Sequence, residues 1–434
     1  MKFLVYFLGS EKDKIFLFRI SFYGVASFAL YVLVFKLNYL LTFPALILGI
    51  CFFVCASFVS PSQRFLKIVI SNVGLLSLMI GVLASVFNLI AFGVSLRESK
   101  DNKVQILYQG GYSKGGLWLT GNQAGILGYR YPPNVSNLRS AKFARKGSTE
   151  RLIYDVKYNI DNLGNRRVSP SATVSSDSVL FVGGSFTFGE GLEDDQTLPA
   201  FFQHYSGLNA INAGMHGYGA HQALALISDP QVYQERTKGH NIKAVVYRTL
   251  LGHVKRTAGY SPWDAEGPCY LKQSGEISYQ GSFRKCGKRP NSFAQRAFAK
   301  FSGSPELITS KLFQSLKSEA PYYQAPKKKD IDLFIDVVEK MHTISVRRGA
   351  EFIVLIEDLH TNPAVCHRDS GILERIIAEL QKAGIRLIKT SEVYSVDSCR
   401  EGIYQIEGDG HPSLVANQAL AQSLTSLLSQ HSDQ

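Results

Sequence analysis

The distribution of apolar residues along the chain changes near Arg97. Before that residue there are three long apolar runs, and each reaches the roughly 20 residues that a helix needs to cross a bilayer. The runs cover Ile15–Phe35, Tyr39–Val59 and Ile68–Leu96. Three runs do not fit a cleaved signal peptide, and nothing later in the chain is apolar enough to bury them as core helices. We therefore expect residues 1–97 to form a membrane anchor with three transmembrane helices.

The basic residues around these runs predict the orientation of the anchor. Lys2, Lys12 and Lys14 precede the first run, and Arg64 and Lys67 separate the second run from the third. The positive-inside rule then places the N-terminus and the second loop in the cytoplasm, so that three spans export everything that follows. We expect a multi-pass protein of the bacterial inner membrane whose remaining part is periplasmic or extracellular.

Residues 98–177 contain short runs that are rich in aromatic residues and glycine, such as GLWLTG and GILGYRYPPN. Such runs, broken by turn residues, are typical of small β-elements. We interpret this region as a small β-rich extension that packs on the rest of the exported part and has no evident chemistry.

Residues 178–434 alternate between short apolar runs and amphipathic segments. The apolar runs predict strands at 178–183, 208–213, 243–249, 351–357 and 386–390, and helical periodicity occurs near 195–205, 219–229, 331–347, 371–383 and 413–429. Buried strands that alternate with helices favour an α/β fold with one parallel sheet covered on both faces. The pattern breaks at about 252–330, and we interpret this insertion as a lid or wall for the substrate.

The chain is strongly basic, with a formal net charge of +12. Its lysines and arginines are scattered apart from Lys327, Lys328 and Lys329, and no base-stacking motif accompanies them. We therefore expect no nucleic-acid partner. A solvated basic surface suits anionic lipid or polysaccharide instead.

Four of the six cysteines lie in the part that we expect to be exported, namely Cys269, Cys286, Cys366 and Cys399. An even number there is compatible with disulfides in an oxidising compartment. We expect local pairing, Cys269 with Cys286 and Cys366 with Cys399, although the sequence leaves the other connectivities open. No Cys-x-x-Cys or matching histidine spacing indicates zinc.

A serine directly follows the first predicted strand of the α/β region. The stretch VLFVGGSFTFGEG, residues 179–191, passes from an apolar run through two glycines to Ser185 and then toward a helix. Open α/β sheets bind ligands at the carboxyl ends of their strands, and a helix start there stabilises negative charge. Ser185 is therefore a candidate nucleophile, the alternative being a serine that caps the next helix.

Near the C-terminus, Asp409 and His411 stand in a loop before a predicted helix. A carboxylate can orient an imidazole, which can then deprotonate a serine hydroxyl that is too weak a nucleophile unaided. Ser185, His411 and Asp409 are thus a candidate triad, in which His411 is the general base and then the general acid. Glu407 is the alternative acid.

Three stretches, GGSFTFGEG, NAGMHGYG and DGHPS, resemble the first, second and fifth sequence blocks of the SGNH (GDSL-like) hydrolases. YNIDNLGNRR, residues 158–167, resembles a segment that precedes the serine block in the bacterial membrane-anchored branch of that family. The resemblance extends over about 158–424. It implies a flavodoxin-like α/β/α sandwich and serine ester hydrolysis, with no cofactor or metal.

The resemblance also implies an oxyanion hole. Its donors would be the backbone N–H groups of Ser185 and Gly217, and a different alignment would select Gly214 or Gly219 in place of Gly217. The family's third donor is usually an asparagine.

Two positions depart from the family pattern. His253 follows the third predicted strand where the asparagine is expected, and its imidazole N–H is a candidate replacement donor. Gly184 stands where the family has an aspartate that helps to fix the serine loop.

Together these features predict a membrane-anchored serine esterase that removes a small O-acyl group from an extracytoplasmic glycan or cleaves another ester. One alternative is an O-acyltransferase for a surface polysaccharide, in which a sugar hydroxyl replaces water. Three spans are few for handling a cytoplasmic acyl donor, so this alternative needs a membrane acyltransferase partner. A further alternative is a glycan-binding protein whose site has decayed, which the two departures suggest.

Overall fold

The computed structural model describes residues 50–51, 54, 72, 75, 105–110, 118–120, 123–146, 149–168, 176–287, 325–358, 370–394 and 402–429. The chain divides into two units, and nearly all of these residues belong to the unit formed by Lys103–Gly303 and Leu316–Gln434. The three apolar runs lie almost entirely outside the described residues, so the membrane anchor stays a prediction. Within the described ranges, no helix combines the length and the apolar character needed to cross a membrane.

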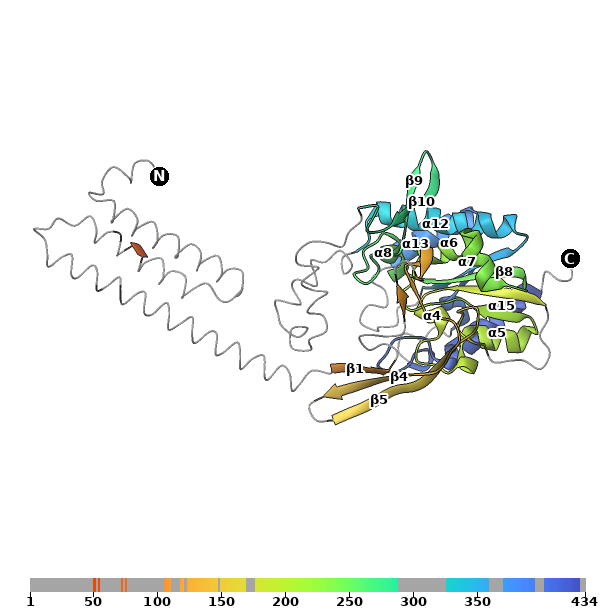
Figure 1. Ribbon diagram of the computed structural model, residues 1–434, viewed down its shortest axis with the longest axis horizontal. Coiled ribbons are helices and arrows are strands. Elements are labelled where there is room, and N and C mark those ends of the chain that lie inside the picture. The colour runs from red at the N-terminus through yellow and green to blue at the C-terminus, as the bar shows by residue number, and fades with distance from the viewer. Residues whose placement is uncertain are drawn as a thin grey trace, which may run out of the picture. The chain divides into compact units, whose positions relative to one another are not determined.

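The larger unit is built on a five-stranded parallel sheet (Figure 1). Its strands are β6 (Asp177–Gly183), β7 (Asn209–Asn212), β8 (Asn241–Leu250), β11 (Glu351–Glu357) and β12 (Arg386–Lys389). The order is β12-β11-β8-β6-β7, and every neighbouring pair is parallel. Read from β7, this is the 2-1-3-4-5 order of flavodoxin-like sheets. The predicted α/β fold with a central parallel sheet is confirmed.

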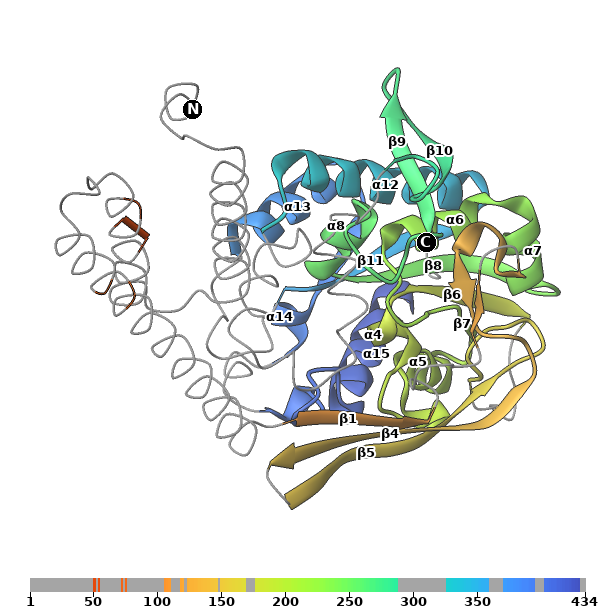
Figure 2. The same cartoon turned by 60° about the vertical axis from the view of Figure 1, so that its left-hand side comes forward.

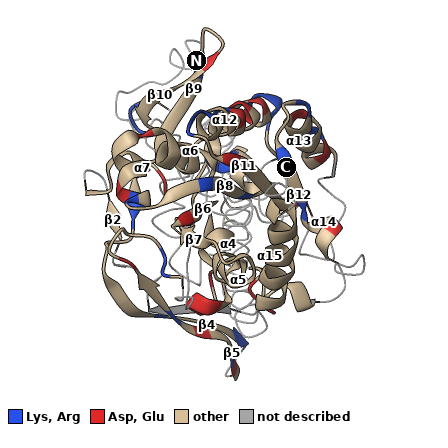
Figure 3. Ribbon diagram, turned by 90° about the vertical axis from the view of Figure 1, so that its right-hand side faces the viewer, with Lys and Arg blue, Asp and Glu red and all other residues tan. Residues whose placement is uncertain are grey.

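Helices cover both faces of this sheet (Figure 3). One face carries α5 (Leu198–Ser206) and α15 (Leu414–Ser429), and the other carries α6 (Ala220–Ser228), α12 (Lys328–Arg347) and α13 (Ser370–Lys382). Successive strand residues point to opposite faces. Val179 and Phe181 therefore join the core with α5 and α15, whereas Leu180 and Val182 join the core with α6 and α12. The result is a three-layer sandwich.

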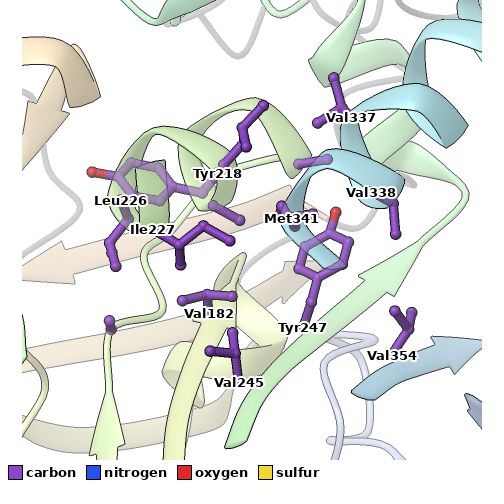
Figure 4. Close-up of a cluster of buried hydrophobic side chains, with 14 of the residues drawn as sticks. Val182, Tyr218, Leu226, Ile227, Val245, Tyr247, Val337, Val338, Met341 and Val354 are labelled. Atoms are coloured by element: carbon purple, nitrogen blue, oxygen red, sulfur yellow. The ribbon is translucent and has the colours of Figure 1, made fainter. Parts of the chain in front are cut away.

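The core beneath α6 and α12 is apolar and tightly buried. Val182, Val245 and Val354 from the sheet belong to one buried apolar cluster with Ile227 and Met341 from the helices (Figure 4). Each of these side chains is at most 1% exposed. Burying one such side chain contributes about 1.5–3 kcal/mol, so this layer fixes the helices on the sheet.

The β-rich extension is a three-stranded antiparallel sheet (Figure 2). It contains β1 (Gln105–Gly110), β4 (Val135–Lys146) and β5 (Thr149–Ile160) in the order β1-β4-β5. Arg166 joins it to the parallel sheet, because this residue forms antiparallel bridges with both Ile160 and Asn212. The extension is therefore continuous with the β7 edge.

The remaining elements of the larger unit are short. They are β2 (Leu119–Thr120), β3 (Tyr129–Arg130), α4 (Ser185–Phe188), α7 (Pro230–Thr237), α14 (Thr390–Val393) and the 3-10 turns Gly125–Leu127, Asp194–Gln196 and Gly402–Tyr404.

The insertion begins with α8 (Gly252–Thr257) and continues into a β-hairpin that sequence patterning did not predict, formed by β9 (Pro268–Gln273) and β10 (Glu276–Ser282). Ser274 and Gly275 at its tip both have positive φ, as a two-residue type I′ turn requires. The expected Cys269–Cys286 disulfide joins the two ends of this hairpin. Cys366 and Cys399 lie outside the described residues, so their pairing stays a prediction.

Removing the Cys269–Cys286 disulfide should destabilise the protein, because the bond closes a loop with a sequence separation of 17. A loop of about that length corresponds to about 3 kcal/mol of chain entropy in the unfolded state. We expect Cys269→Ser/Cys286→Ser to lower the free energy of unfolding by 2–4 kcal/mol, measured by urea unfolding. Cys51→Ser is the matched control, because Cys51 is a free thiol. Equal stability of the two variants would contradict this expectation.

Candidate active site

The serine turn is shaped by two glycines. β6 ends at Gly183, and α4 begins with Ser185. A Cβ at Gly183 would lie 2.4 Å from Thr187 Oγ1, and its φ is 150°, so a side chain does not fit there. Gly189 ends the turn in the left-handed conformation, and its N–H donates to Ser185 O at 2.8 Å. This sharp turn holds Ser185 at the carboxyl edge of the sheet, where the strand order reverses between β6 and β8.

Ser185, His411 and Asp409 lie in hydrogen-bonding contact. Ser185 Oγ is 2.8 Å from His411 Nε2, and His411 Nδ1 is 2.5 Å from Asp409 Oδ2. The serine and the histidine are 226 positions apart in the sequence. In this order, the imidazole can accept the serine proton on one ring nitrogen while the carboxylate fixes the other.

A tight loop places the histidine. Gly408 and Gly410 both have positive φ, and the Ile406 N–H donates to His411 O at 2.8 Å. The Asp409 carboxylate also accepts the His411 backbone N–H at 3.1 Å. Glu407, the alternative acid, points elsewhere: it is exposed and bonds the Arg151 guanidinium at 2.7 Å.

Lys142 of β4 bonds the second oxygen of Asp409. Both side chains are buried, with 6% and 0% of their surface exposed. Burial alone would raise the pKa of Asp409, but the hydrogen bonds from His411 and Lys142 outweigh it and lower that pKa, so the carboxylate is charged. The β-rich extension, for which no evident chemistry was expected, thus supplies a buried cation to this candidate site from β4.

Glu190 is a second buried carboxylate at the imidazole, and sequence reasoning missed it. Its Oε2 lies 3.1 Å from His411 Nε2 and 3.1 Å from His216 Nδ1. Burial opposes its charge, but the charge of His411 and the hydrogen bonds from both histidines hold the pKa of Glu190 well below its usual range. The sequence indicated a role for Glu190 only through its position in the stretch 179–191, five residues after Ser185.

The two carboxylates change the titration of His411. Burial lowers the pKa of this imidazole, but the charge of Glu190 and the hydrogen bonds to Asp409 and Glu190 outweigh it and raise the pKa to about 9. The resting site then holds two anions and two cations, the latter being the His411 imidazolium and the Lys142 ammonium.

Glu190, Asp409 and His411 have ligand atoms within 4.8 Å of one another, which in distance alone would suit a metal ion. The ammonium of Lys142 already faces Asp409 and would repel such a cation. The contacts of these groups therefore fit proton transfer better than metal binding.

Gly217, the candidate oxyanion donor, lies in the segment after β7. The Tyr129 hydroxyl donates to His216 O at 2.9 Å. Because the C=O and N–H of a trans peptide point in opposite directions, the Gly217 N–H points away from Tyr129. A Cβ at Gly217 would lie 2.7 Å from Trp263 Nε1 and 2.7 Å from the Tyr129 hydroxyl, so this position requires glycine. Trp263 belongs to the insertion, which thus forms a wall beside this glycine.

The neighbouring glycines pack against other elements. A Cβ at Gly214 would lie 2.5 Å from Phe188 N, so this glycine lets the segment approach the backbone of α4. A Cβ at Gly219 would lie 2.8 Å from Arg256 Cβ. At Gly214 and Gly219, the lack of a side chain allows the backbone to pack closely against α4 and α8.

His253 lies beside Gly184, so the two departures from the family pattern are neighbours in space. A Cβ at Gly184 would lie 2.9 Å from His253 Nε2. The hydroxyls of Tyr247 and Thr249 lie 2.8 and 3.2 Å from His253 Nδ1. In the tautomer in which a hydroxyl donates to Nδ1, the ring proton is on Nε2. Among the described residues, this buried Nε2 has no hydrogen-bond partner. Burial lowers the pKa of His253 well below its usual range, so the imidazole is neutral.

Two buried arginines hold the serine loop by its carbonyl groups. Arg166 donates to Phe188 O at 2.9 Å, Gly189 O at 2.6 Å and Leu192 O at 2.6 Å. Arg248 of β8 donates to Phe186 O at 3.1 Å and pairs with Glu357. These donors satisfy carbonyls that a one-turn helix leaves unpaired.

Arg166→Met should unfold the serine loop or strongly destabilise the protein, because the substitution removes the hydrogen-bond donor of three buried carbonyls. Each buried group left unsatisfied costs about 1–3 kcal/mol, so we expect a loss of at least about 3 kcal/mol in urea unfolding. Arg139→Met is the control: that arginine is exposed and pairs only with Asp155 among the described side chains. Its loss should leave the stability nearly unchanged. Similar losses in both variants would refute the role of Arg166.

No family model matches the chain, and no curated protein matches it. Solved structures with a similar architecture include a GDSL-like lipase from Bacteroides thetaiotaomicron, with 12% identity, a TM-score of 0.32, and coverage of 59% of this chain and 89% of the other. An α/β hydrolase from the metagenome of Lake Arreo has 11% identity and a TM-score of 0.33, over 57% of this chain and 93% of the other. An acetylxylan esterase from Geobacillus stearothermophilus has 10% identity and a TM-score of 0.33, over 59% and 95%.

Proposed function

We propose that this protein is a serine esterase of the SGNH type, with Ser185 as nucleophile, His411 as general base and acid, and Asp409 as the carboxylate that orients it. The observation that carries the proposal is the 2.8 Å contact between Ser185 Oγ and His411 Nε2, with Asp409 2.5 Å from the other ring nitrogen. A decayed site would have no reason to keep a serine, an imidazole and a buried carboxylate in this order. The geometry therefore favours an enzyme over a binding protein.

In the first half-reaction, Ser185 Oγ attacks the ester carbonyl while its proton passes to His411 Nε2. Negative charge develops on the carbonyl oxygen, and the backbone N–H groups of Ser185 and Gly217 and the Nε2–H of His253 are the donors we assign to it. As the intermediate collapses, His411 returns the proton to the leaving alcohol. The acyl group stays on Ser185.

In the second half-reaction, water attacks the acyl-enzyme while His411 accepts its proton, and Ser185 is released with the acid. A sugar hydroxyl in place of water would make the same site an O-acyltransferase. Both outcomes require the neutral form of His411 at the start of each half-reaction.

For the substrate we propose a small O-acyl group on a glycan outside the cytoplasm, with the enzyme anchored in the inner membrane. Three features support this placement: the apolar runs before Arg97, the basic residues around them, and a disulfide in the insertion. Trp263, 45% exposed beside Gly217, supplies an apolar face at the site that suits the C–H face of a sugar.

Ser185→Ala should abolish turnover of p-nitrophenyl acetate by the full-length protein, because it removes the nucleophile. Serine triads lose about 10⁴-fold or more in kcat from such a change. A fluorophosphonate probe should label Ser185 in the unaltered protein, as mapped by peptide mass spectrometry. Acyl transfer to an added glycan that exceeds hydrolysis would identify a transferase.

Ser178→Ala is the matched control. Ser178 also faces an imidazole, with Oγ 2.9 Å from His240 Nδ1, but it lies within β6 and is fully buried. We expect this variant to keep its activity and its labelling. The proposal fails if labelling maps to another residue, or if a folded protein shows neither labelling nor turnover.

His253→Ala should lower kcat by about 10²–10³-fold with little change in KM, since one oxyanion donor is lost. His253→Asn restores an amide donor of the kind usual in the family, and it should recover part of that loss. A drop in kcat that both variants share, or no drop in either, would exclude His253 as a donor.

A further inference from the structure

We propose that Glu190 is a further catalytic residue, a second carboxylate that binds His411 on the ring nitrogen opposite Asp409 and keeps the base protonated at rest. This proposal rests on the esterase function proposed above and extends it. It makes the site a Ser-His-Asp-Glu cluster that works best at alkaline pH.

The first observation is that both ring nitrogens of His411 face a carboxylate. Nδ1 is 2.5 Å from Asp409 Oδ2, and Nε2 is 3.1 Å from Glu190 Oε2. A neutral imidazole carries one N–H, so it can donate to only one of the two. The imidazolium carries a proton on each nitrogen: Nδ1–H donates to Asp409, and Nε2–H lies between Glu190 and Ser185 Oγ, which is 2.8 Å away. Two carboxylates around one imidazole therefore favour its protonated form.

The second observation is that Glu190 is held in place. Its carboxylate is 5% exposed, and it contacts His216 Nδ1 at 3.1 Å and the Tyr154 hydroxyl at 3.4 Å. His216 is fully buried, and burial lowers its pKa, so it is a neutral donor rather than a competing cation. A buried carboxylate is stabilised by a cation nearby, and the His411 imidazolium, with Nε2 3.1 Å from Glu190 Oε2, can supply one.

The surrounding charges do not cancel this effect. Among the described residues, the groups around His411 and its two carboxylates include Ser185 and the Phe186 ring from α4, Glu190 from the loop after it, Asp409 from its own loop, Lys142 from β4, Tyr154 and Tyr158 from β5, Tyr131, and His216 from the segment after β7. Two cations in the described part of the chain lie near this cluster: Lys142 contacts Asp409, and Arg166 donates to the carbonyl of Gly189, the residue before Glu190. The charge of Glu190 nevertheless raises the pKa of His411.

Glu190 then has two opposite effects on the reaction rate: it lowers the fraction of neutral His411, and it assists proton transfer to the His411 that is neutral. With a pKa of about 9, only about one hundredth of His411 is neutral at pH 7, so activity should rise as pH increases through 9. Once His411 is neutral, the charge of Glu190 favours the transfer of the Ser185 proton to Nε2. Removing that charge should shift the active range to lower pH and lower the plateau.

The test compares the pH dependence of fluorophosphonate labelling of Ser185 in the full-length protein, from pH 6 to 10.5, with that of Glu190→Gln. We expect the midpoint of the rise to fall by at least one pH unit and the plateau to fall several-fold, so that the two profiles cross. Glu150→Gln, which removes an exposed carboxylate paired with Arg145, should leave the profile unchanged. A profile of Glu190→Gln that is scaled down with an unmoved midpoint would reduce Glu190 to a structural residue and overturn the proposal.

A second measurement does not depend on catalysis. The ¹⁵N-histidine NMR titration of His411 in the Ser185→Ala protein should have its midpoint near 9, and a midpoint near 6.5 would overturn the proposal even if Glu190→Gln does not fold. Glu190→Asp, which keeps the charge one methylene farther away, should give an intermediate midpoint. If Ser185 is not labelled at any pH but His411 titrates near 9, the esterase function fails, while the proposed effect of the two carboxylates on His411 stands.

Discussion

Arg166 connects the β-rich extension, the parallel sheet and the serine loop of the candidate site. Its backbone bridges β5 of the extension to β7 of the parallel sheet, and its guanidinium donates to carbonyls of the serine loop. A buried charge is costly unless it is paired. Here Asp194 pairs with it, and the rings of Tyr158 and Phe188 lie 4.5 and 4.6 Å away. One side chain thus ties the extension, the sheet edge and the loop with Ser185 into a single structure.

The extension contributes electrostatics as well as packing. Lys142 reaches Asp409 from β4, and Tyr154 reaches Glu190 from β5. Two buried anions around one imidazole would otherwise repel each other, and Lys142 with the His411 imidazolium balances them. The cluster can stay buried because it is close to neutral as a whole.

The two departures from the SGNH pattern have one physical explanation. The His253 imidazole occupies the space that a side chain at position 184 would need. A glycine there and a histidine after β8 therefore belong together, and neither by itself indicates a damaged site. The aspartate common in the family would collide with this imidazole.

By itself, the sequence determined the strands and helices of the sheet region, the Ser185 turn, and the pair Asp409 and His411. These features depend on local periodicity, on turn glycines and on motifs a few residues long. The hairpin in the insertion was missed because its alternation is weak and its signal is the single dipeptide Ser274-Gly275.

Only the tertiary structure decided that Glu190 contacts His411, that Lys142 contacts Asp409 and His216 contacts Glu190, and that Glu407 pairs with Arg151 instead. These contacts link β4, the loop after α4 and the segment after β7 to a loop near the C-terminus. The sequence alone does not show which charged residues will be buried next to one another in the folded protein. The pKa of His411 depends on that burial and on distances of about 3 Å, which the packing of distant segments sets.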